Sequence, residues 1–92
     1  MLDTDMLKYL VELVGTFMLV FVILRKSEPI AIVVTLLAMI YFGGNISGAS
    51  YNPAVSMILF LQNKLSVSEL QGYVGMELLG AYSALLLHNH LK

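Results

Sequence analysis

The stretch Ser47–Val55, which reads Ser-Gly-Ala-Ser-Tyr-Asn-Pro-Ala-Val, constrains the fold of this chain most, and it occurs only once. It follows a long apolar run. The apolar run after it, residues 53–61, would span only roughly 13 Å as a helix, about half a bilayer. Irregular backbone at membrane depth is tolerated only where it is buried in protein or lines a water-filled path. The loop therefore points to a pore.

Composition supports a membrane setting. Of the 92 residues, 59% are hydrophobic and 12% are charged, whereas soluble domains hold about 45–50% apolar and 25% charged residues. The net charge of −1 and the absence of cysteine argue against nucleic-acid binding, a disulfide framework and a cysteine metal site. Asp3 and Asp5 precede Lys8, and no small-x-small cleavage site follows the first apolar run, so we expect no removable signal peptide.

The hydrophobic pattern predicts one all-α membrane domain over residues 1–92. The first apolar run is about 28 Å long as a helix, enough to cross the hydrocarbon core, and the second is expected to end where Gly43-Gly44-Asn45 interrupts the pattern. A multi-pass integral membrane protein follows, with three transmembrane helices and one re-entrant half-helix. The expected spans are 6–24, 30–43 and 67–87, and the expected half-helix is 53–61.

Asn52 and Pro53 form a favourable helix start. Asn accepts backbone N–H bonds at an N-cap, and Pro suits the first helical position because it has no amide hydrogen to lose. Gly48 relaxes the steric limits on the backbone before it. The half-helix would then point a partial positive charge into the membrane centre, which favours lone-pair oxygens and opposes protons and cations.

The segment Gly44–Val55 resembles the first Asn-Pro-Ala loop of the aquaporin and glycerol-facilitator family, the major intrinsic proteins. Glu12–Phe17 is similar to the first helix of that family, and Tyr73–Ala81 is similar to its third helix. The resemblance covers essentially the whole chain but only the first half of a family member. It therefore implies half of an aquaporin fold.

The resemblance also implies roles for matched positions. Loop carbonyls would form a ladder of acceptors along a pore, with Asn52 donating at its centre and Glu12 bracing the loop. Selectivity-filter positions would be Ile32 and Val55. The implied pore-lining residues are Gly48, Ala49, Ser50, Tyr51, Asn52, Pro53 and Ala54.

Two departures from the family concern the support of the loop. Ser50 stands where the family usually has histidine, and Glu77 stands where it usually has glutamine. An ionisable group at membrane depth is costly and usually functional. Glu12 is either a brace for the loop or a carboxylate that reaches the interface. Glu77 is either a buried hydrogen-bonding strut for the loop or a protonated residue at a helix contact.

The remaining polar residues suggest structure rather than chemistry. Gly80 and Ala84 form a small-xxx-small pair that suits close helix packing. His88 and His90 are expected to be solvated, since their spacing does not make them converge on a metal. No nucleophile–base pair, phosphate loop or metal cluster is present in the sequence, so we expect no enzyme activity, no metal and no cofactor.

Flanking charges are nearly balanced across the expected spans. Lys8 and Lys64 would lie on one side of the membrane, and Arg25, Lys26 and Lys92 on the other. Such weak bias permits insertion in both orientations, and many transporters and channels are inverted repeats. These features lead to the hypothesis of a homo-oligomer in which an antiparallel pair forms each pore.

The leading functional interpretation is a passive channel subunit in a lipid bilayer for water and small neutral solutes such as glycerol. A non-conducting truncated relative that only associates with other channel chains is the alternative, and a fragment of a longer product is a third. Charge balance suits the first interpretation, but it would also suit a fragment whose partner half sets the orientation.

Overall fold

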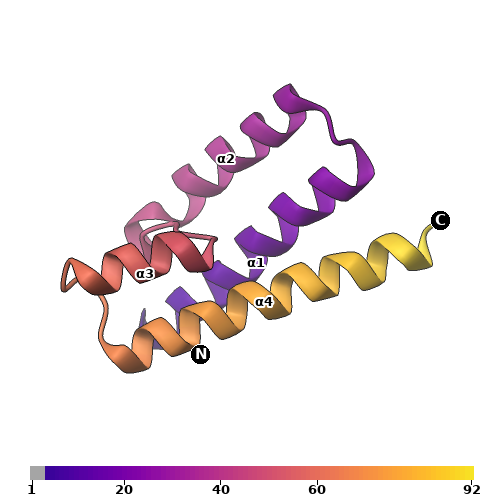
Figure 1. Cartoon of the computed structure of the whole chain (residues 1–92). Helices are drawn as coiled ribbons and strands as arrows, with labels where there is room; N and C mark the ends of the chain where they lie inside the picture. The colour runs from indigo at the N-terminus through magenta and orange to yellow at the C-terminus, as the bar shows by residue number, and fades with distance from the viewer. Residues whose placement is uncertain (1–3) are drawn as a thin grey trace.

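The computed structural model describes residues 4–92, which form four helices connected by short segments (Figure 1). Residues 1–3 of the expected domain lie outside the described part. The helices are α1 (Thr4–Arg25), α2 (Pro29–Ser47), α3 (Pro53–Leu61) and α4 (Val67–His90). The described fold is all-helical, as the hydrophobic pattern predicts.

Helix α2 corrects one expectation. It continues through Gly43, Gly44 and Asn45 to Ser47 and does not end near Gly43. Each glycine costs about 1 kcal/mol relative to alanine in a helix, yet an unpaired backbone group at membrane depth costs several times more. The helix ends at Gly48, whose φ of 88° is left-handed and whose N–H donates to the Gly44 carbonyl at 3.1 Å.

Helices α1 and α4 lie side by side and form the centre of the molecule (Figure 1). Gly80 permits this contact, because a Cβ there would lie 2.5 Å from the carbonyl oxygen of Leu13. Ala84, one turn later, is fully buried. The small-residue pair on α4 therefore packs against α1, as its spacing predicts. Helix α2 contacts α1, and α3 contacts α4.

The described core is more polar than that of a soluble protein, and the outside is apolar. Large apolar side chains are exposed along all four helices. The buried polar residues are Glu12, Thr16, Ser47, Ser50, Ser56 and Glu77, and the buried apolar residues are Val11, Tyr51, Tyr73 and Ala84. Since exposed apolar patches of this extent mark contact with lipid or partner chains, the arrangement suits a bilayer.

Two helices within residues 4–92 are long and apolar enough to cross a membrane: Asp5–Arg25 and Pro29–Ser47. Only 22% and 11% of these segments are buried, unlike the core helix of a soluble protein. Helix α4 has 24 residues but is more polar and does not meet the same criterion. The third span therefore stays a prediction.

Candidate functional site

The loop of residues 48–52 joins α2 to α3 and has an unusual backbone. Gly48, Ala49 and Tyr51 all have positive φ, at 88°, 52° and 51°. For a residue other than glycine, such a conformation costs on the order of 1–3 kcal/mol and persists only where the surroundings enforce it. Two such residues in one short loop therefore require strong contacts from the neighbouring helices.

Glu12 of α1 supplies the largest share of these contacts. Its Oε1 accepts bonds from the Tyr51 N–H at 2.7 Å and the Ser50 hydroxyl at 2.9 Å. Its Oε2 accepts bonds from the Ser47 hydroxyl at 2.6 Å and the Ser50 N–H at 3.3 Å. Glu12 is fully buried, so the carboxylate is held by the loop and does not reach an interface.

A second carboxyl group approaches the loop from α4. Oε2 of Glu77 lies 3.0 Å from the Ser50 hydroxyl oxygen and 2.8 Å from that of Ser56, in the first turns of α3. The Ser50 and Ser56 hydroxyls are themselves 2.8 Å apart. Glu77 therefore links α4 to both the loop and α3, while Glu12 links α1 to the loop.

Two tyrosines fix the ends of the loop. The Tyr51 hydroxyl donates to the Met39 carbonyl on α2 at 2.7 Å, and the Tyr73 hydroxyl donates to the Ser47 carbonyl at the end of α2, also at 2.7 Å. Each bond crosses between elements. Together with the two glutamates, they connect the loop to α1, α2 and α4.

Four backbone carbonyl groups of the loop lack partners in the described part of the chain. Within residues 4–92, none of the carbonyl oxygens of Gly48, Ala49, Ser50 and Tyr51 accepts a hydrogen bond, although the Ser47 and Asn52 carbonyls on either side are paired with the Tyr73 hydroxyl and the Ser56 N–H. Buried or membrane-embedded carbonyls are almost always satisfied. Four consecutive open acceptors therefore need partners from outside the described residues, such as water.

The N-terminus of α3 lies next to these carbonyls. Asn52 is extended, at φ −158° and ψ 126°, and its Oδ1 accepts the Ala54 N–H at 2.8 Å, with Pro53 in the first turn. The side chains of Asn52, Pro53, Ala54 and Val55 are exposed. The cap uses the amide oxygen and leaves the Asn52 NH₂ group free to donate outward.

The predicted site residues divide into two groups in space. The loop, the start of α3, Glu12 and Glu77 come together around Ser50. Ile32 lies instead in the first turn of α2, at the end of that helix away from the loop, and is half-buried. The structure thus does not bring Ile32 to Val55.

Sequence reasoning missed several residues that hold the loop. Ser47 and Ser56 each donate to, or lie against, a buried carboxyl group, and Tyr73 anchors the end of α2. The spacing of four between Asn52 and Ser56 was an available signal, since it places Ser56 one helical turn inside α3 on the same face. Ser47 and Tyr73 carried no local signal, because their partners are distant in sequence.

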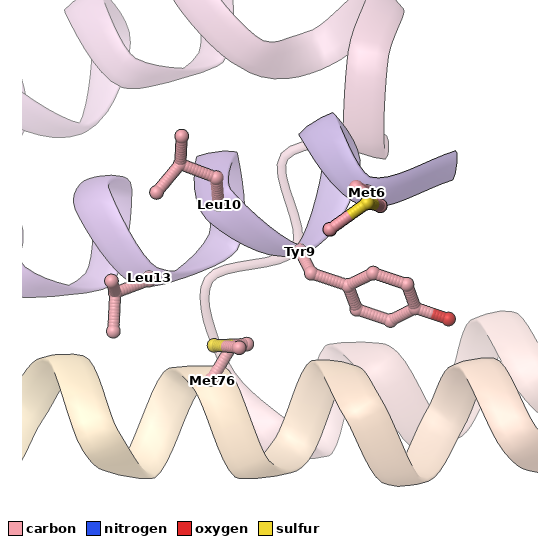
Figure 2. A pocket seen from close by; sticks show the side chains of 5 residues that line it. All are labelled: Met6, Tyr9, Leu10, Leu13 and Met76. Carbon is pink, nitrogen blue, oxygen red and sulfur yellow. The ribbon is translucent and has the colours of Figure 1, made fainter. Parts of the chain in front are cut away.

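Two hollows in the described part of the chain differ in their lining, and one of them adjoins the loop. One, of about 270 Å³, lies between α1 and α4 and is almost entirely apolar (Figure 2). Its side chains are Met6, Tyr9, Leu10, Leu13 and Met76. Another, of about 430 Å³, is lined by Ser47 and Gly48 at the start of the loop and by the ion pair between Lys8 and Glu69. No group of three or more His, Asp or Glu residues that could hold a metal occurs within residues 4–92.

Comparisons with known proteins agree with the loop motif. The chain is 36% identical to glycerol uptake facilitator protein-like 6 of Lactiplantibacillus plantarum, over 86% of this chain and 41% of that protein. It is 32% identical to aquaporin NIP3-1 of Arabidopsis thaliana, over 80% of this chain and 27% of that protein. The chain thus spans less than half the length of these curated relatives. No solved structure matches it.

The family profile of the major intrinsic proteins matches residues 26–92. This range contains α2, the loop, α3 and α4, and therefore the open carbonyls, the Asn52 cap and Glu77. The match covers most of the chain and includes the segment that the geometry singles out. The chain belongs to the major intrinsic protein family.

Proposed function

We propose that the chain is a passive channel subunit that conducts water and small neutral solutes such as glycerol. Membership of the major intrinsic protein family implies an integral membrane protein. The open carbonyls of residues 48–51 support the proposal most directly, because they offer a row of acceptors that only a polar solute can satisfy at membrane depth. The names of the two relatives, a glycerol facilitator and an aquaporin, agree with it.

Selection against ions would follow from the same geometry. The N-terminus of α3 carries a partial positive charge next to the open carbonyls, which opposes cations and protons. Asn52 would donate to a passing oxygen while the carbonyls of residues 48–51 accept its hydrogens. Val55, beside the α3 N-terminus, would set the width and polarity of the constriction there. Ile32, at the other end of α2, would reach the same constriction only if it came from a second copy. Neither residue adds charge.

A single chain supplies one side of such a pore. Within the described residues, α2 packs along α1 and α3 packs along α4, and neither packs along the other. The relatives are more than twice as long as this chain. We propose that a second copy in inverted orientation completes the pore, with the two α3 N-termini meeting near the membrane centre. The nearly balanced flanking charges support insertion both ways.

Osmotic swelling of proteoliposomes that contain only this chain tests conduction. We expect water to enter faster than in empty liposomes, and glycerol to enter as well. The variant Ala54→Trp places a bulky ring beside the α3 N-terminus and should abolish the increase. Leu78→Trp, at an exposed position on α4, is the matched control and should retain it. Impermeability of the unmodified chain to both solutes would contradict the proposal.

Cysteine cross-linking tests the inverted pair. The chain has no native cysteine, so a disulfide in Ala54→Cys can only join two copies. In an inverted pair, the two copies of residue 54 lie close together at mid-membrane. The two copies of Gln62, at the far end of α3, would instead lie on opposite membrane surfaces. We expect a dimer from Ala54→Cys and none from Gln62→Cys. A Gln62→Cys dimer without an Ala54→Cys dimer would indicate a parallel pair.

The alternative function is a non-conducting chain that only associates with other channel proteins. The short length relative to the curated relatives favours it. Swelling separates the two functions, since this alternative requires that liposomes with the chain alone behave as empty ones. If liposomes that also contain a full-length family member were then tested, any conductance would come from that partner, and this chain would only modify it.

A further inference from the structure

Five side chains form a buried oxygen cluster behind the loop: Glu12, Ser47, Ser50, Ser56 and Glu77. Glu12 and Ser56 are 0% exposed and Glu77 is 1% exposed. The two carboxyl groups reach the cluster from α1 and α4, and both contact the Ser50 hydroxyl. Two negative charges this close in a buried site would repel each other strongly. The number of protons in the cluster therefore matters.

Glu12 has the partners that an ionised carboxylate needs. Two backbone N–H groups, of Ser50 and Tyr51, and two hydroxyls, of Ser47 and Ser50, point at its two oxygens. The backbone N–H groups can only donate, so Glu12 must accept. Its negative charge is therefore spread over four donors.

Glu77 has no comparable set. Both of its neighbours, the Ser50 and Ser56 hydroxyls, lie against Oε2, and Oε1 is buried with no partner in the described part of the chain. The ion pairs of residues 4–92 join Lys8 to Asp5 and Glu69, so no cation neutralises Glu77. A buried carboxylate with one bare oxygen and no cation is strongly disfavoured.

The hydroxyl protons do not suffice for two ionised carboxyl groups. Four close contacts join Ser50, Ser56, Oε1 of Glu12 and Oε2 of Glu77, at 2.8–3.0 Å. The two hydroxyls bring one proton each, so two contacts would set lone pair against lone pair. One more proton, on Oε2 of Glu77, gives an unbroken chain in which Glu77 donates to Ser56, Ser56 donates to Ser50, and Ser50 donates to Glu12. Only one of the four contacts, between Ser50 and Glu77, then lacks a proton of its own.

We propose that Glu77 binds a proton at neutral pH and acts as a hydrogen-bond donor that, through Ser56 and Ser50, supports the loop against the charge of Glu12. Glu77 thus positions the loop, and the bound proton is what allows it to donate a hydrogen bond. Loss of that proton would leave a second carboxylate, that of Glu77, against the Ser50 hydroxyl and would loosen the loop from α4. This role is independent of whether the chain conducts any solute.

Few other ionisable groups face the cluster. Glu12 faces it from α1, Tyr51 from the loop, and Tyr73 from α4, one turn before Glu77; α3 carries no ionisable side chain. On α2, Tyr41 is exposed and lies before the turn that ends at Ser47. The tyrosines titrate only in alkaline solution, which leaves Glu12 and Glu77 as the groups to distinguish.

Infrared spectroscopy of the reconstituted full chain tests the proposal, because a protonated carboxyl group has a carbonyl band that a carboxylate lacks. At neutral pH we expect this band in the unmodified protein, its loss in Glu77→Gln, and its retention in Glu69→Gln, where the exchanged group is paired with Lys8. No band in the unmodified protein, or a band that persists in Glu77→Gln, overturns the proposal. If Glu77→Gln does not fold, Glu77→Asp should shift the band, and an unmoved band overturns it.

Stability provides an independent measurement. A carboxyl group that stays protonated when folded and ionises when unfolded makes folding bind one proton, so stability falls as pH rises. Between roughly pH 5 and 8 we expect the folding equilibrium constant to fall by up to tenfold per pH unit more in the unmodified chain than in Glu77→Gln. His88 and His90 are present in both proteins and cancel. Equal pH dependence of the two proteins contradicts a proton on Glu77.

Discussion

Tyr51 occupies space that two glycines leave empty on α1 and α2. A Cβ atom at Gly15 would lie 2.1 Å from Cε1 of the Tyr51 ring, and one at Gly43 would lie 2.1 Å from its hydroxyl oxygen and 2.5 Å from Val11. Distances this short do not occur in folded proteins, so these glycines serve close packing. The position of the Tyr51 ring in turn fixes the left-handed backbone of the loop.

We therefore expect Gly15→Ala and Gly43→Ala each to lower the free energy of unfolding by about 1–3 kcal/mol, the usual cost of overpacking. Gly75→Ala is the matched control, since a Cβ there meets nothing within 4 Å and alanine is the better helix former. Reversible unfolding in mixed detergent micelles, followed by circular dichroism, measures all three. A loss of stability in Gly75→Ala equal to that of the others would argue against this packing role.

Local chemistry predicted part of the loop and missed the rest for a physical reason. Asn52 and Gly48 act through their own backbone neighbourhood, so their cap and positive φ could be predicted from residue type. Ala49 and Tyr51 take the same left-handed region against their own preference. Glu12 accepts the Tyr51 N–H from 39 positions away, and the Ser47 hydroxyl that accepts the Ala49 N–H is itself bonded to Glu12. No local pattern encodes the contact with Glu12.

Helix α3 has only nine residues, and an isolated helix of that length is unstable in water. It depends on its cap and on packing against α4. Asn52 has two functions there: its amide oxygen caps the helix, and its NH₂ group is free to donate to a solute. Serine at this position can cap the helix, because its hydroxyl oxygen accepts the same kind of bond. It has no NH₂ group and therefore cannot donate to a solute as the amide does.

This difference predicts two separable outcomes. Asn52→Ser should keep the free energy of unfolding within about 0.5 kcal/mol of the unmodified chain, and Asn52→Ala should lower it by about 1 kcal/mol. Water permeability of proteoliposomes should fall severalfold in both. Full permeability in Asn52→Ser would show that the Asn52 amide does not take part in conduction. A large loss of stability in Asn52→Ser would show that Asn52 stabilises the fold by more than capping α3.

The length of α2 shows where helix prediction from local signals fails. Gly43-Gly44-Asn45 resembles a helix end by residue type, yet the helix reaches Ser47. Gly43 is needed in the helix to admit Tyr51, and the backbone bonds around it are too costly to leave unpaired in a membrane. The start of α3, with Asn52 as its cap and Pro53 in its first turn, was predicted correctly because such a start is a local property.

The proposed inverted pair predicts that orientation can be set by charge. Gln62→Lys with Ser68→Lys adds two exposed cations at the end of α3 and the start of α4, and Asn89→Lys with His90→Lys adds two at the far end of α4. Each double variant should insert mainly one way, since lysine-rich segments stay on the cytoplasmic side. Alone, each should lose most of its water permeability. Produced together, they should recover it.

The control for this experiment replaces the same four residues with a neutral amide other than the native residue, glutamine or asparagine. These replacements leave the lysine bias unchanged and should not alter permeability. Full activity of one double variant alone, with its orientation confirmed as uniform by protease accessibility, contradicts an inverted pair. Failure of the mixture to recover, with both variants present in the membrane, contradicts it as well.

At the level of the complete chain, the sequence was sufficient for the helical class, the membrane setting and the family, because apolar length and the Asn-Pro-Ala loop are strong signals. The same signals did not identify the central α1–α4 contact in detail. Gly80 could be predicted to pack closely, but its partners Leu13 and Phe17 depend on the alignment of two helices distant in sequence. The support of the loop by two carboxyl groups, one from each of these helices, depends on the same alignment.

The central pairing of α1 with α4 has a consequence for synthesis. α1 is the first described helix to leave the ribosome and α4 is the last, yet the loop made between them needs a glutamate from each. When α2 and α3 emerge, Glu12 is already present but Glu77 is not. Until α4 is inserted, the loop therefore has its contacts with Glu12 but not those with Glu77. In this interval it lies in the translocation machinery or at the lipid boundary. Slowing translation after residue 61 should lengthen that interval and expose the loop to chaperones and proteases.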